Sequence, residues 1–393
     1  MKTTRLFKDF FNSEKAGGLV LISCTILSLV LANSRFGDAY QHFWHTPFAG
    51  GSIEYWVNDG LMAIFFLLIG LELEREIYQG ELSNIKDALF PILGAIGGML
   101  VPAGIYLFLN HDTPTQSGAG IPMATDIAFA LGILSLLGNK VPTSLKVFLT
   151  ALAVIDDLGA IIVIALFYTN ELAWANLGLA LGIFGLLLAL NRLKVHNLIP
   201  YLVGGILMWY FMLHSGVHAT ISGVLLAFAI PFGDGKPAST SYILQHYLHK
   251  PIAFFVLPLF ALANTAIAID GNFSHALSEN YSLGVALGLL VGKPLGIFAF
   301  TFLATQSGIC RLPSDLAWKD ILAVGMLAGI GFTMSIFIAL LAFENQTIIN
   351  HTKLVILLSS SVAAIAGFIV LSLRLQSRES HHIPDTSDTD SSY

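Results

Sequence analysis

Long apolar stretches separated by short polar breaks run through the whole chain. A helix needs roughly 20 apolar residues to cross a bilayer, and most of these stretches approach that length. The pattern therefore predicts an all-α polytopic membrane protein. Twelve spans are predicted, at residues 15–32, 53–73, 88–109, 119–138, 143–168, 174–190, 198–213, 216–231, 252–269, 282–304, 320–343 and 353–373.

Composition supports a membrane protein and excludes several other classes. Only 11% of the 393 residues are charged, 55% are hydrophobic, and mean hydropathy is +0.76, whereas a soluble domain carries about 25% charged residues. The net charge of −6 comes without long runs of one sign, so no nucleic-acid partner is predicted. Two cysteines, Cys24 and Cys310, provide neither a disulfide framework nor a metal-binding spacing.

The basic residues predict the orientation of the chain in the membrane. If the N-terminus is cytoplasmic, only Arg35 and Lys353 of the 19 basic residues fall outside, Lys293 lies within the membrane, and the other 16 are cytoplasmic. This asymmetry matches the positive-inside rule and requires an even number of spans. Residues 1–14 are then a cytoplasmic N-terminus, 15–373 a single twelve-helix domain, and 374–393 a cytoplasmic, disordered tail.

Two of the apolar segments contain residues that interrupt a helix. In GIPMATDIAFALG, Pro122 breaks the helix and is followed by Thr125 and Asp126. In VGMLAGIGFTMSIF, Gly329 and Gly331 weaken the helix and a threonine follows. Interrupted spans in the two halves of a chain are typical of transporter sites built from broken helices.

Adjacent carboxylates lie in the middle of the apolar run TALAVIDDLGAIIVIALFY, at Asp156 and Asp157. A charge at this depth costs at least ~2.5–3.5 kcal/mol, which argues for a function. A helix cap is disfavoured because the run stays apolar on both sides, and an intramembrane protease is disfavoured because its usual GxGD context is missing. Buried carboxylates bind protons readily, and their ionised oxygens suit a small cation, so an ion- or proton-binding site is favoured.

Lys293, in LLVGKPLGIFAF, is the one basic residue predicted near the middle of a span. A lysine at this depth needs a counter-ion or loses its proton. With Asp126 it is suited to offset the charged ends of half-helices that meet inside the membrane. A light-driven pump with a retinal Schiff base is an alternative, but that architecture places its lysine in the last of seven helices.

Histidines and a charged cluster mark the other candidate positions. His214 and His218 are four residues apart but lack the glutamate of a zinc-protease HExxH motif. His218 is a candidate for pH response, and an ordinary interfacial histidine is an equal alternative. His246 and His249 lie near a predicted cytoplasmic loop, where solvated polar residues are the default.

The cytoplasmic end of the second predicted span carries Glu72, Glu74, Arg75 and Glu76. These charges mark the membrane edge, and they would also form a mouth that attracts cations.

Several of these segments resemble the bacterial NhaA sodium/proton antiporters, in matching order over residues 10–375. They are FFLLIGLELERE (65–76), ATDIAFALG (124–132), AVIDDLGAIIVIALFYTN (153–170), SGVHATISG (215–223), LPLFALANT (257–265), GLLVGKPLGI (288–297) and LAGIGFTMSIFIA (327–339). The resemblance implies twelve helices with inverted-topology repeats, in which the fourth and eleventh helices are discontinuous, unwound near Pro122 and near Gly329 and Gly331.

The resemblance also implies functional residues. It assigns Na⁺ and proton binding to Asp157 and Asp156, with Lys293 beside them and Thr125 and Asp126 on the broken fourth helix. The pH response and the cytoplasmic entrance are assigned to Asp59, Glu72, Arg75, Glu76, His218, Gln245, His246 and His249. This chain departs from the family pattern at Glu74, Tyr242 and Gln245, which leaves the pH set-point open, and its short outer loop around FAGGS leaves the homodimer open.

The implied activity is exchange of cytoplasmic Na⁺ or Li⁺ for external H⁺, with cation and proton competing for the aspartates. The protein would be a pH-regulated secondary transporter and not an enzyme, embedded in the lipid bilayer of the cell inner membrane, with no cofactor. A symporter for an organic solute and a cation channel are the alternatives. The first would need a larger polar cavity, and the second would not generate a pH gradient.

Overall fold

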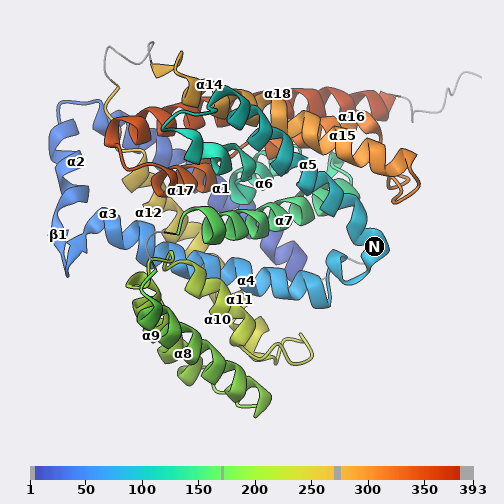
Figure 1. Cartoon of the computed structure of the whole chain (residues 1–393). Coiled ribbons are helices and arrows are strands. Elements are labelled where there is room, and N and C mark those ends of the chain that lie inside the picture. Colours follow the sequence, from blue (N-terminus) through green and yellow to red (C-terminus); the bar gives the residue numbers. More distant parts are fainter. Residues whose placement is uncertain (1–4, 170–171, 270–275, 381–393) are drawn as a thin grey trace, which may run out of the picture.

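The structure, a computed structural model, describes residues 5–169, 172–269 and 276–380. It is built almost entirely of helices (Figure 1). The α-helices are α1 (Arg5–Ala32), α2 (Gly37–His45), α3 (Ile53–Tyr55), α4 (Met62–Tyr78), α5 (Ile85–Leu109), α6 (Ile127–Leu136), α7 (Thr143–Phe167), α8 (Trp174–Arg192), α9 (Ile199–Leu213), α10 (Ile221–Ala229), α11 (Thr240–Pro251), α12 (Leu257–Asn264), α14 (Asn280–Leu287), α15 (Lys293–Gln306), α16 (Trp318–Ala328), α17 (Phe332–Ala342) and α18 (Gln346–Ser380).

Shorter elements connect or extend these helices. The π-helical segments η1 (Trp56–Leu61), η5 (Ile252–Val256) and η6 (Gly288–Gly292) each continue directly into the next α-helix. The 3₁₀ segments are η2 (Glu81–Ser83), η3 (Gln116–Met123) and η4 (Gly138–Lys140).

Eight of the described helices are long and apolar enough to cross a membrane, and the number rises to 10 if each of two bent pairs is one span. The bent pairs are α1 with α2 and α16 with α17. Helix α9, with 15 residues, and α10, with 9, are shorter than a full crossing. The chain is therefore a multi-pass membrane protein, and the count of twelve spans stays a prediction.

Two predicted boundaries are wrong. The predicted span 216–231 is helical only from Ile221 to Ala229, because the chain turns at Gly216, whose φ of 86° lies in the left-handed region. The span predicted at 252–269 begins earlier, since α11 runs from Thr240 through η5 without a break, and it ends at Asn264. The polar residues of α11 predict a loop, but the segment Thr240–Pro251 is helical.

A short hairpin, formed by the FAGGS segment, precedes α3. Strand β1 (Pro47–Phe48) pairs antiparallel with β2 (Gly51–Ser52). The two turn residues, Ala49 and Gly50, have φ of 46° and 90°, the positive values that a two-residue hairpin turn requires.

Two elements stop being helical deep inside the protein. The 3₁₀ segment η3 ends at Met123, the next three residues are not helical, and α6 begins at Ile127. Helix α16 ends at Ala328 and α17 begins at Phe332, with a bend of 49° between them. Assigning these breaks to the fourth and eleventh spans of an inverted repeat stays a prediction.

Close helix packing surrounds these breaks. Helix α5 lies against α15, and a side chain at Gly97 would overlap the backbone of Gly296, so glycine is what permits this approach. Helices α8 and α9 form a hairpin that projects from the rest of the molecule (Figure 1).

The first and last helices of the chain extend beyond the predicted spans. Helix α1 begins at Arg5, within the predicted N-terminal segment 1–14, and α18 continues to Ser380, beyond the predicted end of the last span. Residues 381–393 of the predicted tail lie outside the described residues.

Candidate ion-binding site at the broken helices

Asp156 is held by an ion pair at the centre of the protein. Its Oδ2 lies 2.9 Å from Nζ of Lys293, and neither side chain is exposed. Lys293 is the first residue of α15, directly after the π-helical segment η6, and it also donates a hydrogen bond to the carbonyl of Met123 at the end of η3. The pair thus joins α7 and α15 to the first broken element.

Thr125 connects the same carboxylate to both breaks. Its hydroxyl lies 2.7 Å from Asp156 Oδ2 and 3.0 Å from the carbonyl oxygen of Ala328, the last residue of α16. Non-helical backbone leaves carbonyl groups unpaired, and a buried carbonyl needs a donor. The single hydroxyl proton of Thr125 is shared between this carbonyl, at the opposite break, and the carboxylate of Asp156.

Asp126 acts as a cap for two helices at once. Its Oδ1 accepts a hydrogen bond from the backbone N–H of Phe129 at 2.9 Å, in the first turn of α6. Its Oδ2 accepts bonds from the backbone N–H and the hydroxyl of Thr333, at 3.0 and 2.6 Å, in the first turn of α17. The N–H of Asp126 donates to the carbonyl of Ile330 at 2.7 Å. Helix N-termini favour negative charge, so one carboxylate stabilises both.

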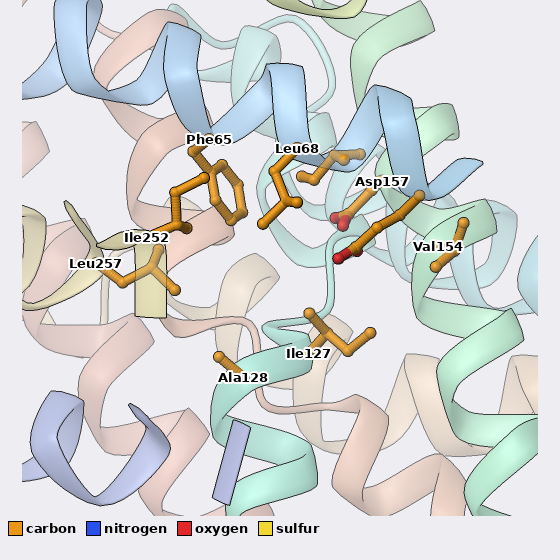
Figure 2. Close-up of a pocket in the computed structure, with 10 residues that line it drawn as sticks. Phe65, Leu68, Ile127, Ala128, Val154, Asp157, Ile252 and Leu257 are labelled. Carbon is orange, nitrogen blue, oxygen red and sulfur yellow. The ribbon is translucent and has the colours of Figure 1, made fainter. Parts of the chain in front are cut away.

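Asp157 faces a small pocket instead of a partner helix. The pocket has a volume of about 20 Å³ and is lined by Asp157, Glu72 and apolar residues of α4, α6, α7, η5 and α12. Figure 2 shows the Asp157 carboxylate in the space between Leu68 of α4 and Ile127 of α6. Asp157 is 2% exposed, and its Oδ1 has no hydrogen-bond partner among the described residues. A pocket of this size holds a water molecule or a small ion.

The predicted entrance residues gather where α4 meets α11. Glu72 Oε1 lies 3.7 Å from His249 Nδ1, and both side chains are largely buried. The Arg75 guanidinium lies over the ring of Tyr242, 5.5 Å from its centroid. Since Glu72 also lines the Asp157 pocket, this cluster adjoins that pocket.

Other predicted entrance residues lie around the same end. His246 stacks on Tyr242, and Gln245 lies on the same helix, half-buried. Glu76 lies one turn beyond Glu72 on α4 and is half-buried. Glu74, where the chain departs from the family pattern, is buried and accepts a 3.5 Å hydrogen bond from Ser241 of α11.

Two predicted residues do not join this cluster. Asp59 lies in η1, 13 positions before Glu72 on one continuous helix, which separates them by about 20 Å. It therefore lies outside the α4–α11 cluster, and its assignment to the pH response or the entrance stays a prediction. His218 lies in the turn between α9 and α10 and hydrogen-bonds the backbone of Tyr168. Tyr168 directly follows α7, about 16 Å along the axis of that helix from Asp157.

Sequence reasoning missed the serines that support the breaks. The Ser335 hydroxyl, in α17, donates to the carbonyl of Ile121 in η3 at 2.7 Å. The Ser360 hydroxyl, in α18, accepts the backbone N–H of Phe332 at 3.1 Å. The one signal for Ser360 was the run of three serines, 359–361, inside an apolar helix.

This multi-pass protein combines buried carboxylates, a buried lysine and interrupted helices. That combination is typical of secondary ion transporters. The family described as Na⁺/H⁺ antiporter 1 matches residues 8–371. The Na⁺/H⁺ antiporter NhaA of Flavobacterium psychrophilum is 72% identical over 371 residues, covering 94% of this chain and 97% of that protein. The NhaA protein of Cytophaga hutchinsonii is 60% identical over 385 residues, covering 98% and 100%.

The fold has a relative among solved structures as well. The sodium proton antiporter MjNhaP1 of Methanocaldococcus jannaschii superposes with a TM-score of 0.51 at 15% identity, covering 95% of this chain and 96% of that one. At this identity the likeness concerns the fold alone. The chain belongs to the Na⁺/H⁺ antiporter 1 family, and the resemblance found in the sequence is confirmed.

Proposed function

We propose that this protein exports cytoplasmic Na⁺ or Li⁺ in exchange for external H⁺, and that Asp157 with Asp156 is the shared binding site. Family membership and the names of its relatives support Na⁺/H⁺ exchange. The observation that carries the assignment to Asp157 is its buried carboxylate, which lines a small pocket while one oxygen lacks a partner. Ionised carboxylate oxygens are the ligands that a hard cation prefers.

Competition at one site accounts for the coupling. A protonated carboxylic acid is a poor ligand for Na⁺, so Asp157 holds a cation or a proton and never both at once. Each cation carried outward is then followed by protons carried inward. As the pH falls, protons occupy the site and transport decreases, which makes the exchange pH-regulated.

Asp156 has a different role in the exchange cycle from Asp157, because its carboxylate is already paired with Lys293. Lys293 and Thr125 both contact its Oδ2, while its Oδ1 has no hydrogen-bond partner among the described residues. A cation that reaches Asp157 would add positive charge next to Asp156 and so weaken the ion pair of Asp156 with Lys293. Removing one partner of a buried pair is costly, so cation binding and the pair are energetically linked.

Alternating access follows from the two breaks. The hydrogen bonds between Asp126 and Thr333, and between Thr125 and Ala328, tie the two broken elements together beside the acids. Rocking of one half of the protein against the other would expose the pocket first to one side and then to the other. The distribution of basic residues supports an inner-membrane protein with both termini in the cytoplasm.

The pocket disfavours the two alternative transporters. A symporter for an organic solute needs a cavity of roughly 300 Å³ or more, whereas this pocket measures about 20 Å³. A cation channel needs no group at which protons and cations exclude one another. Asp157 provides such a group, so exchange is favoured.

The test uses everted membrane vesicles that respiration has acidified inside. Na⁺, Li⁺ or K⁺ is added at several pH values, and internal pH is followed with a dye whose fluorescence is quenched in acid. We expect Na⁺ and Li⁺ to raise the internal pH in wild type, and Asp157→Asn to behave like vesicles without the protein, because an amide keeps the shape but loses the charge.

Asp234→Asn is the matched control. Asp234 lies in a loop, exposed, and pairs with Lys236 at 3.0 Å, so the same substitution there should leave exchange unchanged. A wild type that is present in the membrane and leaves the pH gradient intact with every cation would overturn the proposal. Exchange that persists in Asp157→Asn would overturn the assignment of the site.

A further inference from the structure

The N-terminus of α17 is capped by residues from other parts of the chain. The residue before the helix is Gly331, which has no side chain to accept a hydrogen bond from the first turn. The first backbone N–H groups of an α-helix lack partners within the helix and must find them elsewhere. Here the N–H of Phe332 bonds Ser360 of α18, and the N–H of Thr333 bonds Asp126.

Ser360 is placed to act on the ion site through a short series of contacts. It holds Phe332, and the adjacent residue Thr333 donates twice to Asp126. Thr125, adjacent to Asp126, donates to Asp156. Each step is one hydrogen bond or one peptide unit, and Ser360 is only 2% exposed, so water does not compete for its hydroxyl.

We propose that Ser360 is a positioning residue for ion exchange: its hydroxyl holds the first turn of α17 in the orientation in which Thr333 orders Asp126 and thereby the acids beside it. This inference rests on the proposed function. Ser360 does not touch the Asp157 pocket, so it affects cation binding through the alignment of α17 and not by ligating the ion.

The expected consequence is a loss of apparent affinity. Ser360→Ala leaves a buried N–H without an acceptor, and the first turn of α17 shifts or rotates to find another one. We expect the apparent KM for Na⁺ to rise about tenfold, the size that follows from losing one buried hydrogen bond. The maximal rate should change less. Because weaker cation binding lets protons compete better, activity at a fixed low Na⁺ concentration should shift to higher pH.

Two further variants separate positioning from general damage. Ser360→Thr keeps a hydroxyl and should restore most of the wild-type affinity and pH profile. Ser361→Ala is the matched control on the same helix, since Ser361 is exposed and its hydroxyl bonds only the carbonyl of Leu357 one turn earlier, at 2.8 Å. It should match wild type. Ser360→Cys, which fills nearly the same space with a weaker acceptor, replaces the alanine variant if that protein does not accumulate.

Exchange is measured in the everted vesicles described above, with the amount of each variant in the membrane determined by immunoblot. A raised KM in Ser360→Ala that Ser360→Thr restores would support the inference. A wild-type KM and pH profile in Ser360→Ala and Ser360→Cys would overturn it, as would an equal loss in Ser360→Thr or Ser361→Ala. A wild type without Na⁺-dependent exchange would instead overturn the proposed function.

Discussion

The two helical breaks meet at the same place, but they are stabilised differently. At the first break, Asp126 is the N-cap residue of α6, and its side chain accepts a hydrogen bond from the N–H of Phe129. At the second break, Gly331 precedes the helix, and the caps come from Asp126 and Ser360. The first half-helix α6 therefore carries its cap in its own sequence, whereas α17 depends on two other elements.

This difference makes the cap of α17 more sensitive to movements between helices than the cap of α6. A cap within the same segment stays in place when helices move relative to one another, but a cap from another helix changes with that movement. Asp126 belongs to both caps, so it couples α6 to α17. Substitutions at the breaks should therefore rank by how many buried contacts they disrupt.

The largest effect is expected from Asp126→Ala. It leaves the N–H of Phe129, the N–H of Thr333 and the Thr333 hydroxyl without their acceptor, at about 1–3 kcal/mol for each buried group. We expect Na⁺-dependent exchange to fall to background and the melting temperature of the purified protein to drop by several degrees. Asp126→Asn keeps one acceptor oxygen and should be intermediate. Equal stability of wild type and the alanine variant would contradict the double cap.

The next effect compares the two glycines of the second break. A Cβ at Gly329 would lie 2.5 Å from the backbone oxygen of Leu289, which cannot move away easily, so Gly329→Ala should cost about 1–3 kcal/mol. A Cβ at Gly331 would meet the Ser335 hydroxyl, which can rotate and give up its bond to Ile121, at about 1 kcal/mol. Melting temperatures in detergent should rank wild type, Gly331→Ala, Gly329→Ala. The reverse order would show that the site tolerates a shift of Leu289.

Thr333→Val tests the hydroxyl contact between Thr333 and Asp126 alone. Valine fills a similar space, removes the 2.6 Å hydroxyl contact to Asp126 and retains the N–H contact. The loss of one buried hydrogen bond, about 1 kcal/mol, should raise the apparent KM for Na⁺ several-fold, up to about tenfold. Thr333→Ser keeps the hydroxyl and should stay near wild type. Matching affinities for valine and serine would show that the backbone contact is sufficient.

The smallest effect is expected where the start of η3 contacts the end of α17, far from the breaks. The Ser117 hydroxyl donates to the carbonyl of Ala342 at 2.8 Å, joining the start of η3 to the end of α17 at an exposed position. Water replaces such a contact readily, so Ser117→Ala should change stability by at most about 0.5 kcal/mol and leave the KM for Na⁺ unchanged. A large effect on transport would show that the elements are coupled along their whole length and not only at the breaks.

Much of the site was visible in the sequence because it violates the surrounding apolar pattern. Asp156, Asp157 and Lys293 are conspicuous as charges in long apolar runs. The structure places Lys293 against Asp156, and it separates Asp59 from the entrance cluster, because both ends of one helix carry acidic residues. Ser360 was not singled out, since a serine within an apolar helix most often bonds its own backbone, as Ser361 does.

The sequence by itself determined that this is a multi-pass membrane protein with costly polar residues at fixed places, because hydropathy and charge act residue by residue. Through its resemblance it also determined the family. The tertiary structure alone decided which polar groups meet: that Asp157 faces a pocket with Glu72, that one aspartate caps two helices, and that a serine from α18 completes the cap. Such contacts join residues far apart in the chain, 207 positions in the case of Asp126 and Thr333, and only the packing of helices brings them within hydrogen-bonding distance.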